Sequence, residues 1–419
     1  MTKRILAALL LLLCAGAADA GERLTVDEAV AAALAHNANV ASARLEVEKG
    51  QTRVDAARTK RLPSLNLDAM GGEALSNLSI EVRDGAGDTT RVDLARTFNL
   101  FAVVRLTQPI TQLHAINLGV KMQETSLAAD RERERAARLA VTREVKRAYF
   151  AVLAAEAHAG ALKDAVTAWE EVEREMNVRV SQKAALEADR LDASARLAAT
   201  RLAAMSAQHS LATAKDRLTY LVGREIEPVA AEPVEMTEQT ENTSLRPDVR
   251  EARLRVEQAR LAFRLQAAER IPDIALVVSN TTPVNNDVLP RNMTSAGISM
   301  SYEPFTWGRR GRELAEKRLA LEQAELALRD TEAAANVEIA MLRRKVAEGA
   351  AQIGVRRMET DAARERLRIT TVKFQQKTAR PEQLLDAEAS LTNAAAREQE
   401  AIAAWWTARA DYEQAIGKE

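Results

Sequence analysis

Apolar residues recur at alternating three- and four-residue intervals over a long stretch in the first half of the chain. The stretch has no proline, and charged residues fill the positions between the apolar ones. This spacing puts the apolar side chains on one stripe of a helix and predicts coiling around another helix. We expect a long, stiff helix whose partners come from elsewhere in the chain or from other copies. Its seam, interrupted by Glu173, is Val145, Ala148, Val152, Ala155, Ala159, Leu162, Val166, Trp169, Met176 and Val180.

Similar patterns predict further helices on both sides of this stretch. An opening helix begins at the capping box formed by Thr25 and Glu28 and runs to Pro63. The long helix covers residues 110–182, about 72 residues or ~108 Å. A return helix at 184–222, a second opening helix at 248–271 and a second return helix at 381–416 follow. We expect each return helix to be continued, end to end, by the opening helix of the other half of the chain.

Four segments of about ten residues alternate apolar and polar positions, which is typical of β-strands with one apolar face. They begin near residues 64, 97, 274 and 295, and a loop-like, glycine-containing region separates the first two. Such lengths fit either tilted strands in an outer membrane or an ordinary half-buried sheet. Since an open sheet edge cannot lie in lipid, a membrane position requires several copies to share one barrel, and three copies supply twelve strands.

The two halves of the chain match each other in separate blocks. Residues 40–48 and 61–63 match residues 249–257 and 270–272 at an offset of 209, and residues nearer the helix tips match at an offset of 194. Constant offsets indicate an internal duplication. We therefore divide the chain into a signal peptide at 1–20, a first repeat at 21–223, a linker at 224–244 and a second repeat at 245–419.

The first twenty residues indicate export from the cytoplasm. Lys3 and Arg4 precede an apolar run, and residues 18–20 form a small-x-small cleavage site. Cys14 is the alternative, as a lipid-anchor cysteine, but the leucines before it lack the small residue that such processing prefers. Cleavage after Ala20 removes the chain's single cysteine, so we expect no disulfide.

Composition and charge exclude several classes of function. A hydrophobic fraction of 47%, a charged fraction of 28% and an aromatic fraction of 3% favour long helices over a compact aromatic core. The net charge of -1 gives no reason to expect nucleic acid. Phosphate-binding glycine loops and nucleophile motifs are absent from the sequence, so we expect neither an enzyme nor a cofactor. A metal site is not expected either, because the histidines are scattered: His36, His114, His158 and His209.

Several short motifs, in this order, resemble the outer-membrane efflux proteins of the TolC-like type. That resemblance implies a mainly helical fold with a small β part. Long antiparallel hairpins would form a trimeric α-barrel, and four strands per chain would contribute to a shared 12-stranded β-barrel. It also implies a homotrimer in outer-membrane lipid with a periplasmic helical tunnel, in the envelope of a Gram-negative bacterium. The motifs are residues 24–37, 62–65, 108–110, 307–310 and 385–388.

The resemblance implies an exit duct for an inner-membrane pump, joined through a periplasmic adaptor, with a gate near the hairpin tips. The matching gate positions are Asp189, Asp192, Gln383 and Asp386, and the adaptor-contacting tip positions are Gln182, Lys183, Gln376 and Lys377. This chain departs from the family pattern in having lysine at both tips and Phe374 and Ala379 at the positions of a latch. The alternative role for Asp189 and Asp386 is to offset a helix dipole.

We expect passive export of small molecules or metal ions. Two other functions stay open on the sequence alone. A soluble periplasmic coiled-coil adaptor or scaffold would explain the helices and the signal peptide but not the strands. A channel for type I protein secretion would share the fold, and the sequence does not identify the cargo, the pump or the adaptor.

Overall fold

The computed structural model describes residues 22–73, 79–83, 85, 87, 89–93, 98–229, 245–284, 290–376 and 378–418. The predicted signal peptide and Cys14 lie outside these residues, as does most of the predicted linker. The chain forms two compact units. Unit 1 consists of Met1–Arg44, Arg133–Val249 and Glu332–Glu419, and unit 2 consists of Leu45–Glu132 and Arg250–Thr331.

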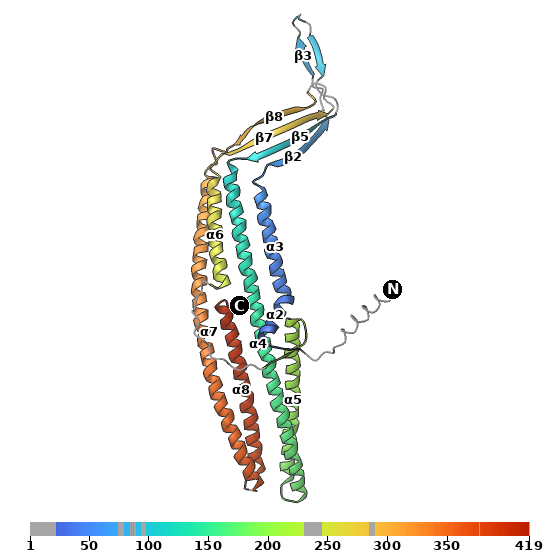
Figure 1. The fold of residues 1–419 in the computed structure, drawn as a ribbon, viewed down its shortest axis with the longest axis vertical. Coiled ribbons are helices and arrows are strands. Elements are labelled where there is room, and N and C mark those ends of the chain that lie inside the picture. Colours follow the sequence, from blue (N-terminus) through green and yellow to red (C-terminus); the bar gives the residue numbers. More distant parts are fainter. Residues whose placement is uncertain are drawn as a thin grey trace, which may run out of the picture. The chain divides into compact units, whose positions relative to one another are not determined.

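Helices dominate the chain, and their lengths follow the predicted pattern (Figure 1). The long helix α4 has 70 residues and the second long helix α7 has 67. The helices are α2 (Val26–His36), α3 (Ala38–Thr59), α4 (Gln112–Ser181), α5 (Glu187–Val222), α6 (Pro247–Ala268), α7 (Arg309–Gln375) and α8 (Pro381–Ala415). None of the described helices is both long enough and apolar enough to cross a membrane.

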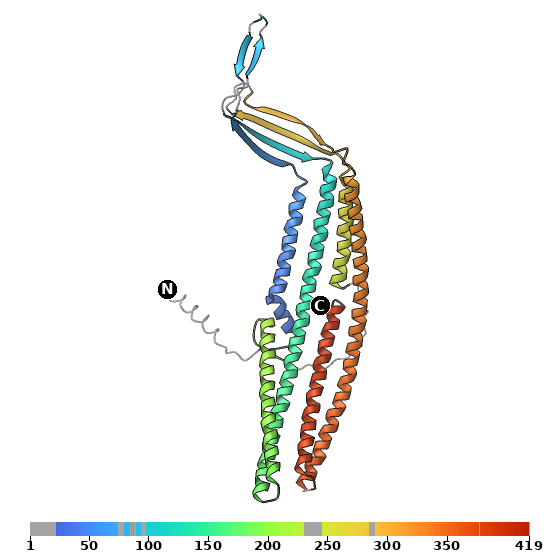
Figure 2. The same cartoon turned by 180° about the vertical axis from the view of Figure 1, so that it is seen from behind.

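The predicted heptad seam contributes to the core of unit 1. Val145, Val152 and Met176 are buried on α4, and Trp169 lies between the last two along the helix. Helix α5 runs back beside α4, and α8 runs back beside α7, which gives two hairpins (Figure 2). Near the turns, side chains of α4 and α5 cluster with Leu385 of α8, so the hairpins also pack against each other.

Ion pairs and stacked rings join the two hairpins away from their turns. Lys146 of α4 lies 2.5 Å from Glu413 of α8, and Arg147 donates to Asp411 at 2.6 Å. Phe150 stacks on Trp406 at a centroid distance of 4.2 Å. Burial alone would raise the pKa of Glu413, but hydrogen bonds and charge from Lys146 and from Arg409 of the same helix hold it below its usual value.

The predicted order of the tandem helices is wrong. Gly223, directly after α5, lies against His36 of α2. Arg246, directly before α6, donates to the carbonyl of Ala415 at the end of α8, and Arg135 of α4 donates to the carbonyl of Gly417 at 2.9 Å. Each return helix therefore meets the opening helix of its own half of the chain. The sequence signals for these helices are local, whereas the order of the tandem helices depends on contacts between distant segments.

The first opening helix is also not continuous, although its predicted capping box is present. Thr25 and Glu28 hydrogen-bond reciprocally at the start of α2. Asn37 then adopts an extended conformation that ends α2, and its side chain accepts a hydrogen bond from the backbone nitrogen of Asn39 at 2.9 Å. The same asparagine thus ends α2 and caps α3, as its side chain favours.

Unit 2 contains the four predicted strands as one antiparallel sheet. Its order is β2–β5–β7–β8, so β2 and β8 are the two edges (Figure 1). Each observed strand begins within two residues of its predicted start. The strands are β2 (Ser64–Glu73), β5 (Phe98–Pro109), β7 (Asp273–Val284) and β8 (Met293–Ser301).

The region predicted as a loop contains a further hairpin. The chain between β2 and β5 forms strands β3 (Ser79–Arg83) and β4 (Thr89–Asp93), which pair with each other in a separate sheet. Each has only five residues, too few for alternation to stand out from a loop. A separate parallel pair in unit 1 joins β1 (Glu22–Leu24) to β6 (Ile226–Pro228), and the Tyr149 hydroxyl donates to the Leu24 carbonyl beside it at 2.9 Å.

Candidate gate and helical tips

The first hairpin turns at the predicted tip residues. Gln182 and Lys183 are exposed, and the backbone nitrogen of Ala184 closes the turn on the Arg179 carbonyl at 2.8 Å. Lys183 has a φ of 57°. This left-handed conformation costs a residue with a side chain ~1–2 kcal/mol, which explains why glycine suits the position better.

The second hairpin has a similar turn. Gln376 is exposed, and its backbone nitrogen donates to the Val372 carbonyl at 3.0 Å. The nitrogen of Thr378 donates to the Lys373 carbonyl at 2.9 Å. Lys377 lies outside the described residues, so its role at the tip stays a prediction.

Two of the predicted gate residues cap the return helices. Asp189 accepts a hydrogen bond from the backbone nitrogen of Leu186 at 2.9 Å, in the first turn of α5. Gln383 accepts from the backbone nitrogen of Arg380 at 3.1 Å, in the first turn of α8. A carboxylate or amide oxygen at this position satisfies an otherwise unpaired donor, and the aspartate also offsets the helix dipole.

The other two predicted gate residues lie further along the same helices. Asp192 and Asp386 lie three residues after the capping positions and are exposed. Asp386 lies 3.9 Å from Arg196 of α5, and both side chains are more than half exposed. Arg196 was not predicted, although it lies four residues after Asp192, the spacing of a helical ion pair. An arginine this close reduces the negative charge that the carboxylates present.

A cation–π contact joins the two hairpins close to their turns. The guanidinium of Arg179, on α4, lies 4.6 Å from the ring centroid of Phe374, on α7. Glu175 accepts hydrogen bonds from the same guanidinium, the shorter at 2.6 Å. Phe374 is buried, so the residue at the latch position joins the hairpins through its ring. No sequence pattern indicates this contact, because it depends on which helices are neighbours.

Helices α5 and α7 each carry a second apolar stripe that none of the described residues of unit 1 covers. On α5, Leu197 faces α4 and is 2% exposed, whereas Leu202 is 65% exposed. On α7, Ile353 packs in the seam with α8, whereas Met358 is 66% exposed. The exposed stripes also contain Leu191, Met205, Val337, Met341 and Val355. A helix with apolar stripes on two sides requires neighbours on two sides.

The four-stranded sheet of unit 2 presents one largely apolar face. Cross-strand neighbours on this face are Leu65 and Leu106, and also Leu276 and Ile298. Large side chains on it are exposed, with Ile298 at 75%. Asn280, Thr282 and Thr294 interrupt the face, but they hydrogen-bond to one another. The other face is more polar: Asn66, Arg105, Ser279 and Ser295 lie in one row across the four strands.

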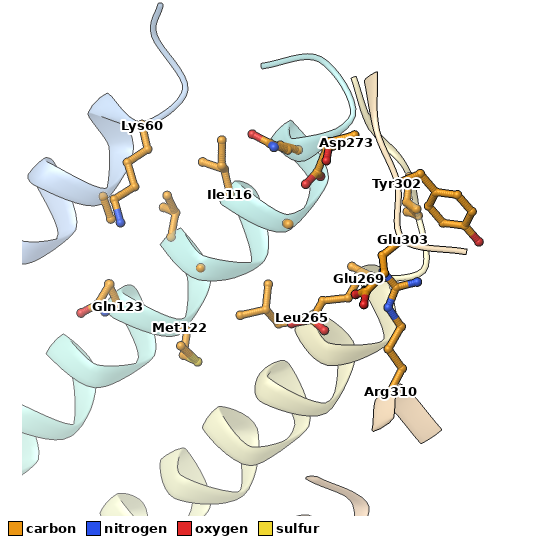
Figure 3. Close-up of a pocket in the computed structure, with 18 of the residues that line it drawn as sticks. Lys60, Ile116, Met122, Gln123, Leu265, Glu269, Asp273, Tyr302, Glu303 and Arg310 are labelled. Atoms are coloured by element: carbon orange, nitrogen blue, oxygen red, sulfur yellow. Dashed lines mark ion pairs between the residues drawn. The ribbon is translucent and has the colours of Figure 1, made fainter. Parts of the chain in front are cut away.

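A pocket of about 750 Å³ lies within unit 2, between the ends of α3 and α6 and the starts of α4 and α7 (Figure 3). Ile116, Met122 and Leu265 form its apolar part, with Lys60 on one side and Glu269 on the other. The pocket could hold a small solute. Within the described ranges, no group of three or more acidic, histidine or cysteine side chains could bind a metal ion.

A family model covers most of the chain. The model of the outer membrane efflux protein family matches residues 29–224 and 241–418. The chain belongs to this family. The family model and the solved structures with this fold describe outer-membrane channel proteins, in agreement with the expectation that the chain is not an enzyme. Among curated proteins, no sequence matches the chain significantly.

Solved structures of similar fold extend over nearly the whole chain. The outer membrane protein VceC from Vibrio cholerae is 20% identical, with 94% of this chain and 96% of that chain covered and a TM-score of 0.78. The Campylobacter jejuni CmeC outer membrane channel is 16% identical, with 94% and 85% covered and a TM-score of 0.78. The open state of the Neisseria gonorrhoeae MtrE outer membrane channel is 19% identical, with 94% and 89% covered and a TM-score of 0.78. This efflux protein therefore has the fold of these channels.

Proposed function

We propose that three copies of this chain form an exit duct in the outer membrane of a Gram-negative bacterium. An inner-membrane pump, joined through a periplasmic adaptor, would export small molecules or metal ions through it. Family membership supports the efflux role. The observation that carries the assembly is the pair of uncovered apolar stripes on α5 and α7.

The two stripes favour closure into a ring. Within unit 1, α5 packs on α4, α4 is joined to α8, and α8 packs on α7, so α5 and α7 are the outer helices. Their stripes differ, and a contact between two different surfaces repeats from copy to copy until the ring closes. The sheet of unit 2 also favours contacts with neighbouring copies, because β2 and β8 are edge strands with unpaired backbone groups on their outer sides. Three sheets of four strands would supply the twelve-stranded barrel expected from the family.

A cysteine pair tests which helices meet. Leu202 and Met358 each lie about 19 residues, or ~29 Å, from the tip of their own hairpin. In the proposed contact, Leu202 of one copy therefore lies at the same height along the helices as Met358 of the next copy. After signal-peptide cleavage no other cysteine remains, and the double variant L202C/M358C should form covalent trimers under oxidation in the membrane. Leu197→Cys with Met358→Cys is the matched control, because Leu197 faces its own hairpin. If oxidised L202C/M358C forms trimers before denaturation but gives only monomers after it, no disulfide has joined the copies, and the α5–α7 contact is contradicted.

The tips are the proposed surface for the adaptor. Gln182, Lys183 and Gln376 are exposed at the hairpin turns, and Lys377 is the repeat-related partner of Lys183. Replacing both lysines with glutamate should reduce export while the amount of trimer stays the same, because Lys183 is exposed, as is Gln376 directly before Lys377. Full export by this variant would show that the lysines do not contribute to the adaptor contact.

The gate is the proposed role of Asp189, Asp192, Gln383 and Asp386. Three copies would place each of these side chains three times around the narrow end of the tunnel. Carboxylates in such a ring attract cations, so we expect conductance to be cation-selective. The caps made by Asp189 and Gln383 are compatible with this role, since a side chain can accept a backbone hydrogen bond and still contribute charge.

The element order supports the proposed duplication. The same order of elements occurs twice along the chain: an opening helix, two sheet strands, a long helix and a return helix. The first set is α3, β2, β5, α4 and α5, and the second is α6, β7, β8, α7 and α8. We keep the repeat boundaries at 21–223 and 245–419 as part of this proposal.

A further inference from the structure

The pocket of unit 2 combines an apolar wall with charged groups (Figure 3). Its volume of about 750 Å³ lies within the range of sites for drug-sized molecules, ~300–1,000 Å³. Ile116, Met122 and Leu265 form the wall, and Glu269 and Asp273 lie where α6 ends and β7 begins. An apolar surface with a few charged groups at its edge is the composition of a site for an amphipathic organic molecule.

Two carboxylates of the pocket are available to a ligand. Glu269 accepts a hydrogen bond from Gln266 at 2.6 Å, but among the described residues no lysine or arginine forms an ion pair with Glu269 or Asp273. Glu303, which also lines the pocket, lies 2.7 Å from Arg309 instead. Both available carboxylates are exposed, so a ligand can reach them.

The positive charge of the pocket is either paired or lies on its opposite side. Arg309 lies between Glu303 and Glu313, at 2.7 and 3.1 Å. Arg310 lies 4.0 Å from Glu303. Lys60 is exposed on the opposite side of the pocket from the two available carboxylates (Figure 3). Its flexible, strongly hydrated ammonium can stay in solvent while a ligand binds, so the pocket favours a cation over an anion.

The register of the sheet gives the face on which the pocket lies. Asp273 of β7 pairs with Ser301 of β8, and both residues line the pocket. They lie six residues from Ser279 and Ser295, so all four share the more polar face, because every second residue of a strand lies on the same face. In the proposed barrel the apolar face contacts lipid, and the polar face with the pocket borders the lumen.

We propose that this pocket binds amphipathic organic cations of drug size, as a site that exported molecules occupy on their way through the duct. The positive group lies beside Glu269 and Asp273, and the apolar part lies against Ile116, Met122 and Leu265. This inference rests on the proposed exit duct, whose cargo it narrows to one chemical class. Because the carboxylates are exposed, binding is weak enough for release, with a dissociation constant of roughly 0.01–1 mM.

Three xanthene dyes of different charge test the pocket. At pH 7, rhodamine 6G is a cation, rhodamine B is a zwitterion and fluorescein is an anion. The purified protein in phosphatidylcholine nanodiscs is titrated against each dye, and the fluorescence anisotropy is compared with that of nanodiscs without protein. We expect rhodamine 6G to bind more tightly than rhodamine B, and fluorescein to show no binding. Added salt should weaken the binding of rhodamine 6G, because it screens exposed charges.

Variants separate the pocket from the general charge of the tunnel. Glu269→Gln with Asp273→Asn keeps the side-chain sizes and should weaken rhodamine 6G binding roughly tenfold, because two ion pairs with the ligand are lost. Leu265→Gln should also weaken it, by making part of the wall polar. The matched control is Glu257→Gln with Glu316→Gln, which removes two carboxylates of α6 and α7 that do not line the pocket and should leave binding unchanged.

Conductance and copy number, measured on the same preparations, distinguish the two ways to fail. If the trimers conduct, unchanged rhodamine 6G binding in either pocket variant would overturn the proposed site and leave the duct intact. Tighter binding of rhodamine B or fluorescein than of rhodamine 6G would likewise overturn the preference for cations. If the wild type forms neither trimers nor conducting channels, the proposed duct fails, and the cargo site fails with it.

Discussion

Replacing Leu202 with glutamate should prevent assembly without unfolding the protomer. Leu202 is 65% exposed on the outer side of α5, so nothing in its own chain depends on burying it. Full burial of a leucine contributes about 1.5–3 kcal/mol, and the exposed part of Leu202 therefore has ~1–2 kcal/mol left to gain at each interface. A glutamate at that position also leaves an unpaired charge in an apolar contact, which costs several kcal/mol more.

Leu197→Glu is the matched control on the same helix. Leu197 is 2% exposed in the seam between α4 and α5, so a charge at that position should destabilise the hairpin itself by more than ~3 kcal/mol. At the exposed position, by contrast, a surface substitution should change the free energy of unfolding of the isolated protomer by no more than about 0.5 kcal/mol.

Two assays separate the outcomes. Circular dichroism in detergent reports helix content, and the mass of the detergent-solubilised particle reports the number of copies. We expect Leu202→Glu to give helical monomers and Leu197→Glu to lose helix content. If Leu202→Glu gives the same amount of trimer as the wild type, the outer stripe of α5 is not an interface and our explanation of its exposure is wrong.

Four further predictions concern the gate, a tip and the pH dependence of stability. Asp189→Asn with Asp386→Asn should weaken cation selectivity in a planar bilayer and leave stability nearly unchanged, whereas Asp189→Ala should also cost α5 about 1 kcal/mol by removing its cap; unaltered selectivity in the double variant would leave capping as the better account. Lys183→Gly should raise the free energy of unfolding by about 0.5–1 kcal/mol, measured by denaturant titration, because glycine removes the left-handed strain; no gain would show that the turn is not strained. Glu413 has a lowered pKa, so its contribution of roughly 2 kcal/mol is present above its unfolded pKa and lost as pH falls through the folded pKa, and Glu413→Gln should therefore destabilise at pH 7 and progressively less as pH falls through the folded pKa. Burial raises the pKa of Glu388, so Glu388→Gln should stabilise the protein at pH 7 and lose this advantage as pH falls, and effects that do not change with pH would refute either assignment.

The regular parts of the fold could be predicted because their signals are local and repeated. The seam from Val145 onward fixes the period of a helix over many turns, and the alternation in residues 98–109 fixes a strand over its full length. Asn37 could not be recognised as a helix break, because asparagine occurs inside helices as well as at their caps. The end-to-end contact of α8 with α6 could not be predicted for a different reason: it joins distant segments, and no local pattern determines it.

For the candidate site, the sequence predicts where residues lie along their helices but not which residues of other helices they contact. The spacing from the tips located Asp189 and Gln383 in the first turns of their helices, and an N-terminal cap is the local consequence of that position. Sequence patterns did not reveal that Arg196 approaches Asp386 or that Arg179 lies over Phe374. Both contacts join helices from different hairpins, and only the packing of the hairpins determines them.

Conductance across a planar lipid bilayer tests the central claim most directly. Purified protein added to one side should insert and produce uniform conductance steps, each from one trimer, with a preference for cations. Leu202→Glu at the same concentration should produce no steps. The account is contradicted if folded wild-type protein gives no conductance and is recovered from cells in the soluble periplasmic fraction without detergent.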